Sequence, residues 1–143
     1  MPDPYAGGLV KESPYAKKEP VMGRIVAVLR LRMDARELEL IKQPSRAVVR
    51  GEVHELIVTG EDAGPGSKVD NVAYLGFFEV LNSGVILAGD EVKWGTANLG
   101  RLAGFDLTHF PNHLNIVLHS DVTKTGEELG LELGSTVQFS SPA

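Results

Sequence analysis

The sequence has no cysteine among its 143 residues. This absence excludes disulfide bonds, thiolate catalysis and zinc sites built from cysteine. The sequence also lacks any apolar run near the roughly 18–20 residues that a membrane-spanning helix needs, so we expect no membrane association. Its N-terminus, MPDPYAGG, lacks the basic and then apolar pattern of a secretory signal. We therefore expect a cytoplasmic protein.

Positive charge is scarce in the last two thirds of the chain. Residues 1–50 hold ten Lys and Arg against six Asp and Glu, whereas residues 51–143 hold four against thirteen. Nucleic-acid binding requires the neutralisation of many phosphates, so this acidic chain is not expected to bind nucleic acid. Charge clusters are most often solvated surface, but complementary clusters on one chain suit self-association, and we expect a homo-oligomer.

Glycine, in contrast, is frequent, at 16 positions, and strand-sized segments recur along the chain. In residues 24–33, apolar residues from Ile25 to Met33 alternate with arginines and valines, which is typical of a half-buried β-strand. Both faces of residues 71–80 are apolar, which predicts an interior strand. Further strands are predicted in residues 47–59 and 135–139. We predict an all-β fold, a small closed or partly open β-barrel formed by one domain, residues 21–143.

Residues 34–43, DARELELIKQ, fit two local structures. In the first, Asp34 caps a short helix that directs Leu38 and Ile41 toward the core. In the second, residues 37–40 alternate like a strand. We favour the short helix, which would be the only helix of the fold.

Glycine-containing turns separate the remaining segments. Residues 85–87 and 91–94 are expected to pair as a compact β-hairpin. Residues 60–67 contain three glycines and one proline, and we interpret them as a surface loop, although their composition is compatible with a lid. Residues 125–128 mark another loop.

Residues 1–20 are predicted to form an extended N-terminal arm. The tripeptide Pro4-Tyr5-Ala6 recurs as Pro14-Tyr15-Ala16, and the prolines exclude a regular helix or a central strand. Our hypothesis is that the two tyrosines anchor the arm on its own barrel or on a neighbouring subunit.

The candidate site lies between Leu99 and Ser120, a stretch that holds three of the four histidines. Two strand-like segments meet there at a polar turn, residues 110–113. His119 is excluded, because about 20 Å of strand, at ~3.3 Å per residue, separates it from His113. The predicted binding residues are Asp106, His109, Asn112, His113, Asn115 and His54.

These residue types allow more than one kind of chemistry. Histidine and aspartate are metal ligands, but the spacing DxxHxxxH matches no established metal motif, so neither a metal nor another cofactor is predicted. No G-x-S-x-G marks a serine nucleophile. Imidazole titrates near neutrality, so His109 or His113 could act with Asp106 in acid–base catalysis. Alternatively, the polar groups satisfy the backbone of a tight turn.

Part of the chain also resembles a known family. The residues that carry the resemblance are Asn98-Leu99, Gly104, Leu107, Phe110-Pro111, Gly134-Ser135, Val137 and Phe139. Over roughly residues 74–139 they resemble the C-terminal half of the glucitol/sorbitol-specific IIA component of the bacterial phosphotransferase system. The resemblance implies a small cytoplasmic β-barrel whose histidine accepts a phosphoryl group for sugar import. Phe105 stands where that family usually has histidine, so no phosphoryl-accepting residue can be carried over.

Three functions follow, in order of preference. The first is a barrel that binds a small-molecule ligand and assembles as a homo-oligomer. The second is a histidine-dependent enzyme or phosphocarrier that acts on a small sugar-like or carboxylate substrate. The third is a structural subunit of a larger assembly. The sequence leaves open whether the protein is an enzyme.

Overall fold

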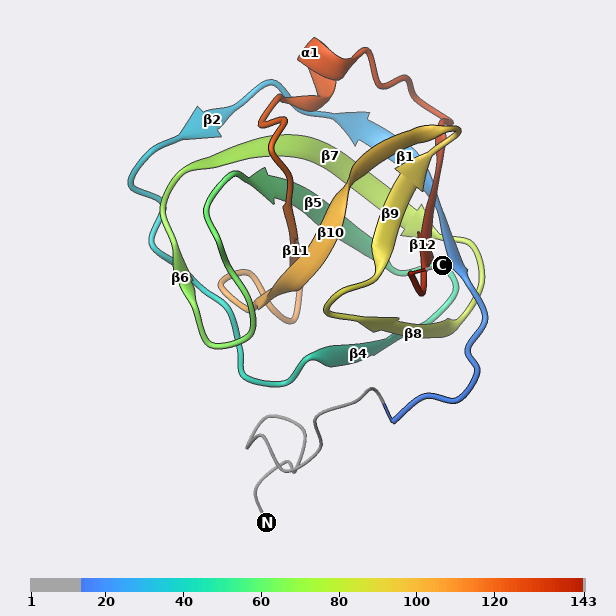
Figure 1. The fold of residues 1–143 in the computed structure, drawn as a ribbon. Helices are drawn as coiled ribbons and strands as arrows, with labels where there is room; N and C mark the ends of the chain where they lie inside the picture. Colours follow the sequence, from blue (N-terminus) through green and yellow to red (C-terminus); the bar gives the residue numbers. More distant parts are fainter. Residues whose placement is uncertain (1–13, 143) are drawn as a thin grey trace.

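Seven strands pair in a closed ring in this computed structural model, which describes residues 14–142 (Figure 1). They are β1 (Val21–Val28), β5 (Val53–Thr59), β7 (Val72–Val80), β9 (Glu91–Trp94), β10 (Ala97–Asp106), β11 (Asn115–His119) and β12 (Thr136–Ser140). Around the ring the order is β1, β12, β9, β10, β11, β5 and β7, and β7 pairs again with β1. All neighbours are antiparallel except β11 and β5. The predicted all-β class is confirmed.

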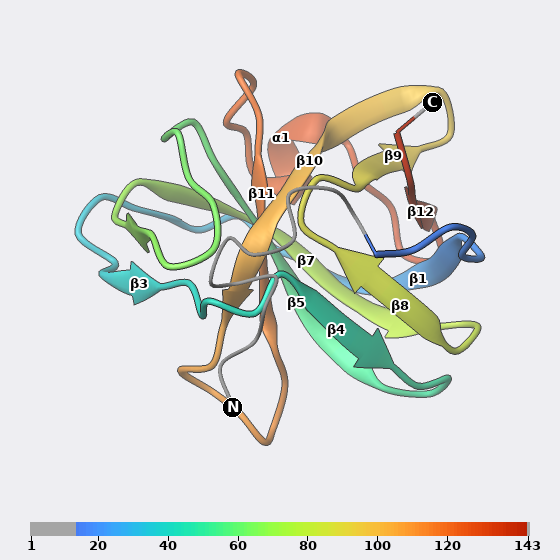
Figure 2. The ribbon, with the colours of Figure 1, turned by 60° about the horizontal axis from the view of Figure 1, so that its bottom comes forward.

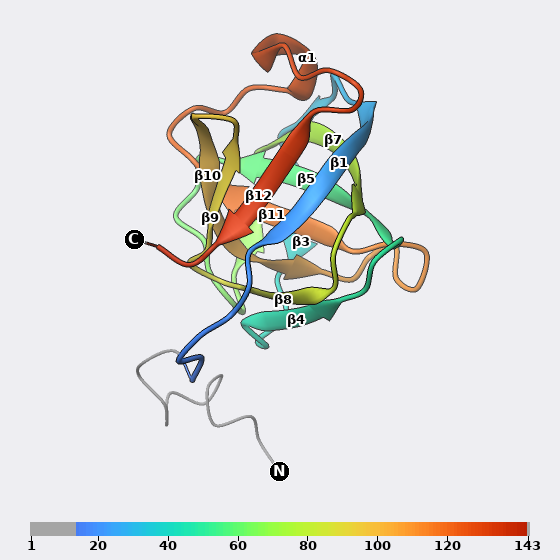
Figure 3. The same ribbon diagram turned by 90° about the vertical axis from the view of Figure 1, so that its right-hand side faces the viewer.

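Shorter elements flank this ring. They are β2 (Arg32–Met33), β3 (Leu38–Glu39), β4 (Ser45–Val48), β6 (Lys68–Val69), β8 (Gly84–Leu87) and the helix α1 (Gly126–Leu129). β4 and β8 form a two-stranded sheet at one end of the ring, and α1 lies at the other end (Figures 1 and 3). Within residues 14–142, no helix has the length and apolar character needed to cross a membrane.

Two apolar clusters pack on opposite faces of the ring. The larger fills its inside and includes Ile25 and Phe78. The smaller lies on the outer face, where Leu38 and Val69 of the β3–β6 sheet cover β5, β7 and β11. Because these three strands are packed on both faces, their central residues are nearly all apolar. The interior position predicted for residues 71–80 is confirmed.

Residues 34–43 do not form the helix that we favoured, so that prediction was wrong. β3 pairs with β6, and Leu40 forms an isolated bridge with Asp106. Leu38 and Leu40 are buried against the outer face of the ring, whereas Glu39 between them is exposed. The alternative strand pattern therefore describes this segment, because pairing and burial outweigh the local preference for a helix.

The predicted hairpin of residues 85–94 is also wrong. β8 pairs with β4, whereas β9 pairs with β10 and β12. Asp90 stabilises the turn between them, since its Oδ2 accepts a hydrogen bond from the Leu87 amide at 2.9 Å. The turn thus carries the chain from the sheet at the end of the ring into the ring itself, and it does not fold β8 back onto β9.

The helix α1 occurs where the sequence predicted a loop. It packs where the strand predicted for residues 24–33 is divided into β1 and β2. Thr125 and Glu128 form a capping box at its start. The helix packs against the gap between β1 and β2, where the Glu127 amide donates to the Leu29 carbonyl at 3.1 Å. Gly126 sits so close to β7 that a Cβ there would lie 1.9 Å from the Leu75 carbonyl oxygen.

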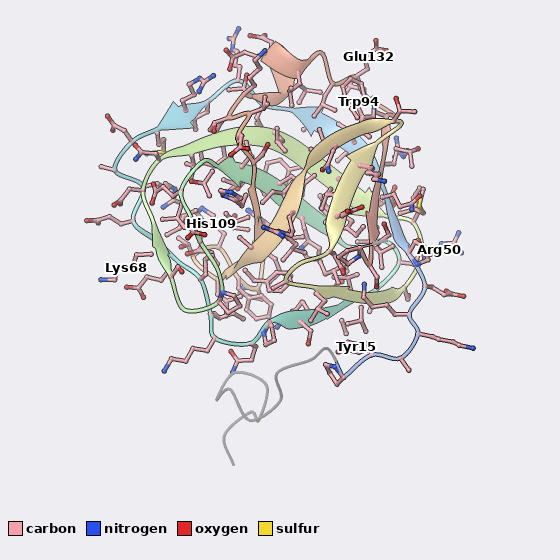
Figure 4. The ribbon with its side chains drawn as sticks, viewed as in Figure 1. Tyr15, Arg50, Lys68, Trp94, His109 and Glu132 are labelled. Carbon is pink, nitrogen blue, oxygen red and sulfur yellow. The ribbon has the colours of Figure 1, made fainter. Side chains whose placement is uncertain are left out.

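The described end of the predicted arm, residues 14–20, contacts the domain of its own chain. The Tyr15 hydroxyl donates to Ser45 Oγ at 3.3 Å, beside β4 (Figure 4). Lys18 Nζ lies 2.7 Å from Asp90 Oδ2, and only 7% and 1% of these two side chains are exposed. Tyr5, the other proposed anchor, lies outside the described residues.

Candidate functional site

The turn between β10 and β11, residues 107–114, projects from the ring (Figure 2). Asp106 anchors it: Oδ1 accepts from the Thr108 amide at 2.9 Å and from Asn115 Nδ2 at 3.0 Å, and Oδ2 accepts from the Glu39 amide at 2.9 Å. Burial alone would raise the pKa of Asp106, but these hydrogen bonds outweigh it and lower the pKa. Asp106 and Asn115 are both buried, and they fix the base of the turn.

A pocket of about 260 Å³ lies between this turn, the strand β4 and the start of β5. We call it the rim pocket. Three predicted binding residues, His54, Asn112 and His113, line it. Its lining is Arg46, Glu52, Val53, His54, Phe110, Pro111, Asn112, His113 and Leu114. Asp106 lines a separate hollow beside β3, so the six predicted residues do not share one cavity.

His54 forms a buried part of the rim pocket wall. Its Nδ1 accepts a hydrogen bond from the Leu114 amide at 3.0 Å, so the proton of the neutral ring lies on Nε2, 3.5 Å from Glu52 Oε1. Burial lowers the pKa of His54, while Glu52 opposes the shift and the charge of Arg46 adds to it. His54 is therefore a neutral imidazole at pH 7.

His113 lies between the rim pocket and the outer face of the ring. Its Nδ1 is 2.7 Å from Asn112 Oδ1, and its Nε2 is 3.6 Å from Glu55 Oε1. Burial lowers the pKa of His113, against an opposing effect of the Asn115 amide. His113 Nε2 and Asn115 Oδ1 are nevertheless buried without a partner of normal hydrogen-bond geometry. The ring packs edge-on against Phe77, with centroids 5.0 Å apart.

His109, labelled in Figure 4, is exposed on the outer side of His113, and the two ring centroids are 5.2 Å apart. Arg36 Nη2 lies 3.4 Å from His109 Nε2, and Arg36 Nε donates to the Tyr74 hydroxyl at 2.7 Å. A guanidinium can only donate, so His109 Nε2 is the acceptor in this contact. Burial raises the pKa of Glu55, although the nearby basic side chains of His109 and Arg36 oppose that shift.

His119 lies at the far end of β11, where its Nδ1 is 2.8 Å from the Glu61 carbonyl oxygen. It borders a different hollow, together with Arg101 and Asp121. The predicted separation of His119 from the turn histidines is therefore confirmed. Across residues 14–142, no three His, Asp or Glu side chains are arranged to hold a metal ion.

Four residues of this region were missed by the sequence analysis: Arg36, Arg46, Glu52 and Glu55. A usable signal existed for both glutamates, because alternation along β5 places Glu52 on the face of His54 and Glu55 on the opposite face. Arg46 gave no signal, since β4 approaches the turn only through its pairing with β8. Arg36 lies in the segment whose structure was predicted wrongly.

One known family matches this chain. Its model covers residues 15–140, which is nearly all of the described chain. Neither the search of curated proteins nor the search of solved structures gives a match. The resemblance to the glucitol/sorbitol-specific IIA component stays a prediction from the sequence. The chain belongs to the family of unknown function DUF6917.

Proposed function

We propose that this protein binds a small polar molecule in the rim pocket and does not transform it. The observation that carries the proposal is the convergence of four polar side chains on one concavity of about 260 Å³. They come from two distant parts of the chain, Arg46, Glu52 and His54 on one side and His113 on the other. A few convergent polar groups within a partly apolar concavity are typical of ligand sites.

The surrounding structure favours a pre-formed site. The turn that forms one wall is held by the buried carboxylate of Asp106, and the opposite wall begins a strand of the ring. Binding groups on a turn that a rigid framework positions lose little freedom when a ligand arrives. Drug-sized ligands occupy pockets of about 300–1,000 Å³, so the ligand expected here is smaller than that class.

The four histidines provide a direct test by NMR, because His54 and His113 line the pocket and His119 does not. The protein, labelled with ¹⁵N in its imidazoles, is titrated with glycerol, glucitol, glucose, lactate and alanine. We expect at least one compound to shift the His54 and His113 ring signals while those of His119 stay in place. The proposal fails if no compound moves them, or if His119 responds equally.

A matched pair of variants places the binding in the pocket. Val53 lines the rim pocket, whereas Val49 is exposed on the same connection outside it. The Val53→Trp side chain fills the pocket and should abolish the shifts, and the Val49→Trp variant should bind as the unmodified protein does. Equal binding by both variants would show that the ligand binds outside the rim pocket.

A second candidate, a histidine-dependent enzyme or phosphocarrier, is favoured by the contact between Glu55 and His113. Burial raises the pKa of the carboxyl group and lowers the pKa of the imidazole, so the two values approach each other. Groups with similar pKa values exchange a proton at low cost, as acid–base catalysis requires.

Incubation with phosphoramidate and measurement of the intact mass tests the phosphocarrier form of this candidate. An acid-labile phosphoryl group that is lost in His113→Gln or His109→Gln, but kept in His119→Gln, would favour phosphotransfer over simple binding. An unchanged mass, or a group that depends only on His119, would contradict the phosphocarrier.

A further inference from the structure

We propose that the ligand of the rim pocket is a small carboxylate, bound by the guanidinium of Arg46, with a hydroxyl or ammonium group on the adjacent carbon that donates to Glu52. This inference rests on the proposed function, because it assigns the chemistry of the ligand in that same pocket. It makes Arg46 the principal anchor, a residue that neither the sequence patterns nor the family match points to.

Arg46 has no ion-pair partner within residues 14–142. Within residues 14–142, three basic side chains are half-buried, namely Lys18, Arg36 and Arg46. Lys18 pairs with Asp90, and Arg36 binds the Tyr74 hydroxyl and His109. The guanidinium of Arg46 lies over the face of Phe110, with Cζ 5.0 Å from the ring centroid, and no carboxylate of the described residues pairs with it. A half-buried cation without an acceptor is suited to binding an anion.

The contact with Phe110 also leaves the guanidinium able to bind a ligand. The guanidinium lies over the Phe110 ring, with Cζ 5.0 Å from the centroid, and an arginine in such a contact still has N–H groups from which a carboxylate can accept two parallel hydrogen bonds. The charge of Arg46 also acts on His54 across the pocket, where it contributes to the lowered pKa of that imidazole. The positive charge of Arg46 is therefore felt by groups inside the rim pocket.

Glu52 is an acidic group in the same pocket. Glu52 Oε1 accepts from the Val49 amide at 2.7 Å, and 44% of the side chain is exposed. Glu52 forms no ion pair with Arg46. The pocket thus presents one cation and one anion that do not neutralise each other. A ligand with a carboxylate next to a donor group can bind Arg46 through the carboxylate and Glu52 through the donor. A phosphate would instead bring a second negative charge toward Glu52.

Affinity measurements with matched probes test the assignment. Lactate and alanine carry the carboxylate with a hydroxyl or an ammonium group, lactamide replaces the carboxylate by a neutral amide, and inorganic phosphate is the competing anion. We expect lactate or alanine to bind at least about 10-fold more tightly than lactamide and phosphate. Lactamide loses the charge-assisted hydrogen bonds to Arg46, and phosphate brings a second negative charge toward Glu52. Which of lactate and alanine binds more tightly identifies the donor group.

Variants assign the effect to Arg46. Arg46→Gln should weaken the binding of lactate or alanine by about 10- to 100-fold and leave lactamide unaffected. The matched control is Arg50→Gln, an exposed arginine outside the pocket, which should bind as the unmodified protein does. Melting curves of both variants establish that each is folded.

The outcomes separate this inference from the proposed function. Equal binding of lactate and lactamide, or an Arg46→Gln variant that binds lactate normally, overturns the carboxylate assignment and leaves small-molecule binding standing. Tighter binding of phosphate than of either carboxylate also overturns it. Binding of glucitol or glycerol alone would support the proposed function and reject the inference, and failure of every probe rejects both.

Discussion

Two imidazole–carboxylate pairs lie on either side of one wall of the ring, and they differ in the burial of the carboxylate. In the rim pair, His54 Nε2 is 3.5 Å from Glu52, whose side chain is 44% exposed. In the outer pair, His113 Nε2 is 3.6 Å from Glu55, whose side chain is only 10% exposed. The two distances are nearly equal, so the pairs differ in the solvent access of the carboxylate and not in the distance between the groups.

This difference in solvent access suggests different roles for the two pairs: the outer pair stabilises the fold, and the rim pair belongs to the proposed binding site. Glu55 pairs in register with Asn115, whose side chain with Asp106 holds the base of the turn, and burial raises the pKa of the Glu55 carboxyl group. A buried network of this kind stabilises one arrangement of the chain. Glu52 instead is partly accessible in the rim pocket, together with the guanidinium of Arg46, which pairs with no carboxylate of residues 14–142. The rim side is therefore the side on which we expect a ligand.

The largest effect on stability is expected from the hydrogen bonds of Asp106 at the base of the turn. Asp106→Ala removes the acceptor of three donors, the amides of Glu39 and Thr108 and the side chain of Asn115. Buried donors without an acceptor are costly, and we expect a loss of about 2–4 kcal/mol in the free energy of unfolding, measured with urea. Asp121→Ala, which removes an exposed carboxylate, is the control. A loss no larger than that of the control would show that the outer network does not hold the turn.

The next effect concerns the neutral imidazole of the rim pair. His54→Phe keeps an aromatic ring near Phe78 but leaves the buried Leu114 amide without its acceptor. We expect a loss of about 1–3 kcal/mol in the free energy of unfolding at pH 7. The exposed His109→Phe is the control and should have little effect. Equal losses would mean that the hydrogen bond from Leu114 to His54 contributes nothing specific.

Acid should also destabilise the unmodified protein through both pairs. A histidine whose folded pKa is lowered contributes stability above its unfolded value of 6.5, and that stability is lost as pH falls through the folded pKa. The free energy of unfolding should therefore decrease below pH 6.5, and it should decrease less in the double variant His54→Gln/His113→Gln. An identical pH profile for both proteins would contradict the lowered pKa values.

Glu55→Gln tests the buried carboxylate, whose pKa is raised, in contrast to the lowered pKa values of the two histidines. Because the folded pKa of Glu55 is raised above its usual 4.5, the protonated form stabilises the fold below pH 4.5 and this contribution is lost as pH rises through the folded pKa. The stability of the variant relative to the unmodified protein should therefore increase as pH rises from 4 to 7. A relative stability that is independent of pH would remove the distinction between the pairs.

The smallest effect on stability is expected for Glu52→Gln. The amide oxygen of Gln can still accept from the Val49 amide, and the 3.5 Å contact of Glu52 with the neutral His54 is long, so the free energy of unfolding should change by less than about 0.5 kcal/mol. The same variant should weaken the binding of the small carboxylate. A change in stability without a change in binding would place Glu52 among the supporting residues.

Local patterns in the sequence predicted what depends on local geometry. Alternation along β11 placed Ile116 and Leu118 opposite Val117, and the first two lie inside the ring while the third packs outside it. The same alternation separated His119 from the turn. The helix at residues 34–43 and the hairpin at residues 85–94 were wrong because each strand there pairs with a partner distant in the sequence, β6 for β3 and β4 for β8.

The candidate site was predicted in part for the same reason. His54, Asn112 and His113 line the rim pocket, whereas Asp106 and Asn115 anchor the turn. An isolated residue such as Asp106 gives no sign of which backbone amides will surround it. Arg46 became a candidate only when the fold placed its guanidinium on Phe110.

A crystal structure determined in the presence of lactate or alanine tests the central claim most directly. We expect the carboxylate to lie in the rim pocket with two hydrogen bonds from Arg46, and the contact between His113 and Glu55 to stay as it is in the free protein. A ligand bound on the outer face, or one seated in the rim pocket without contact to Arg46, would contradict this account.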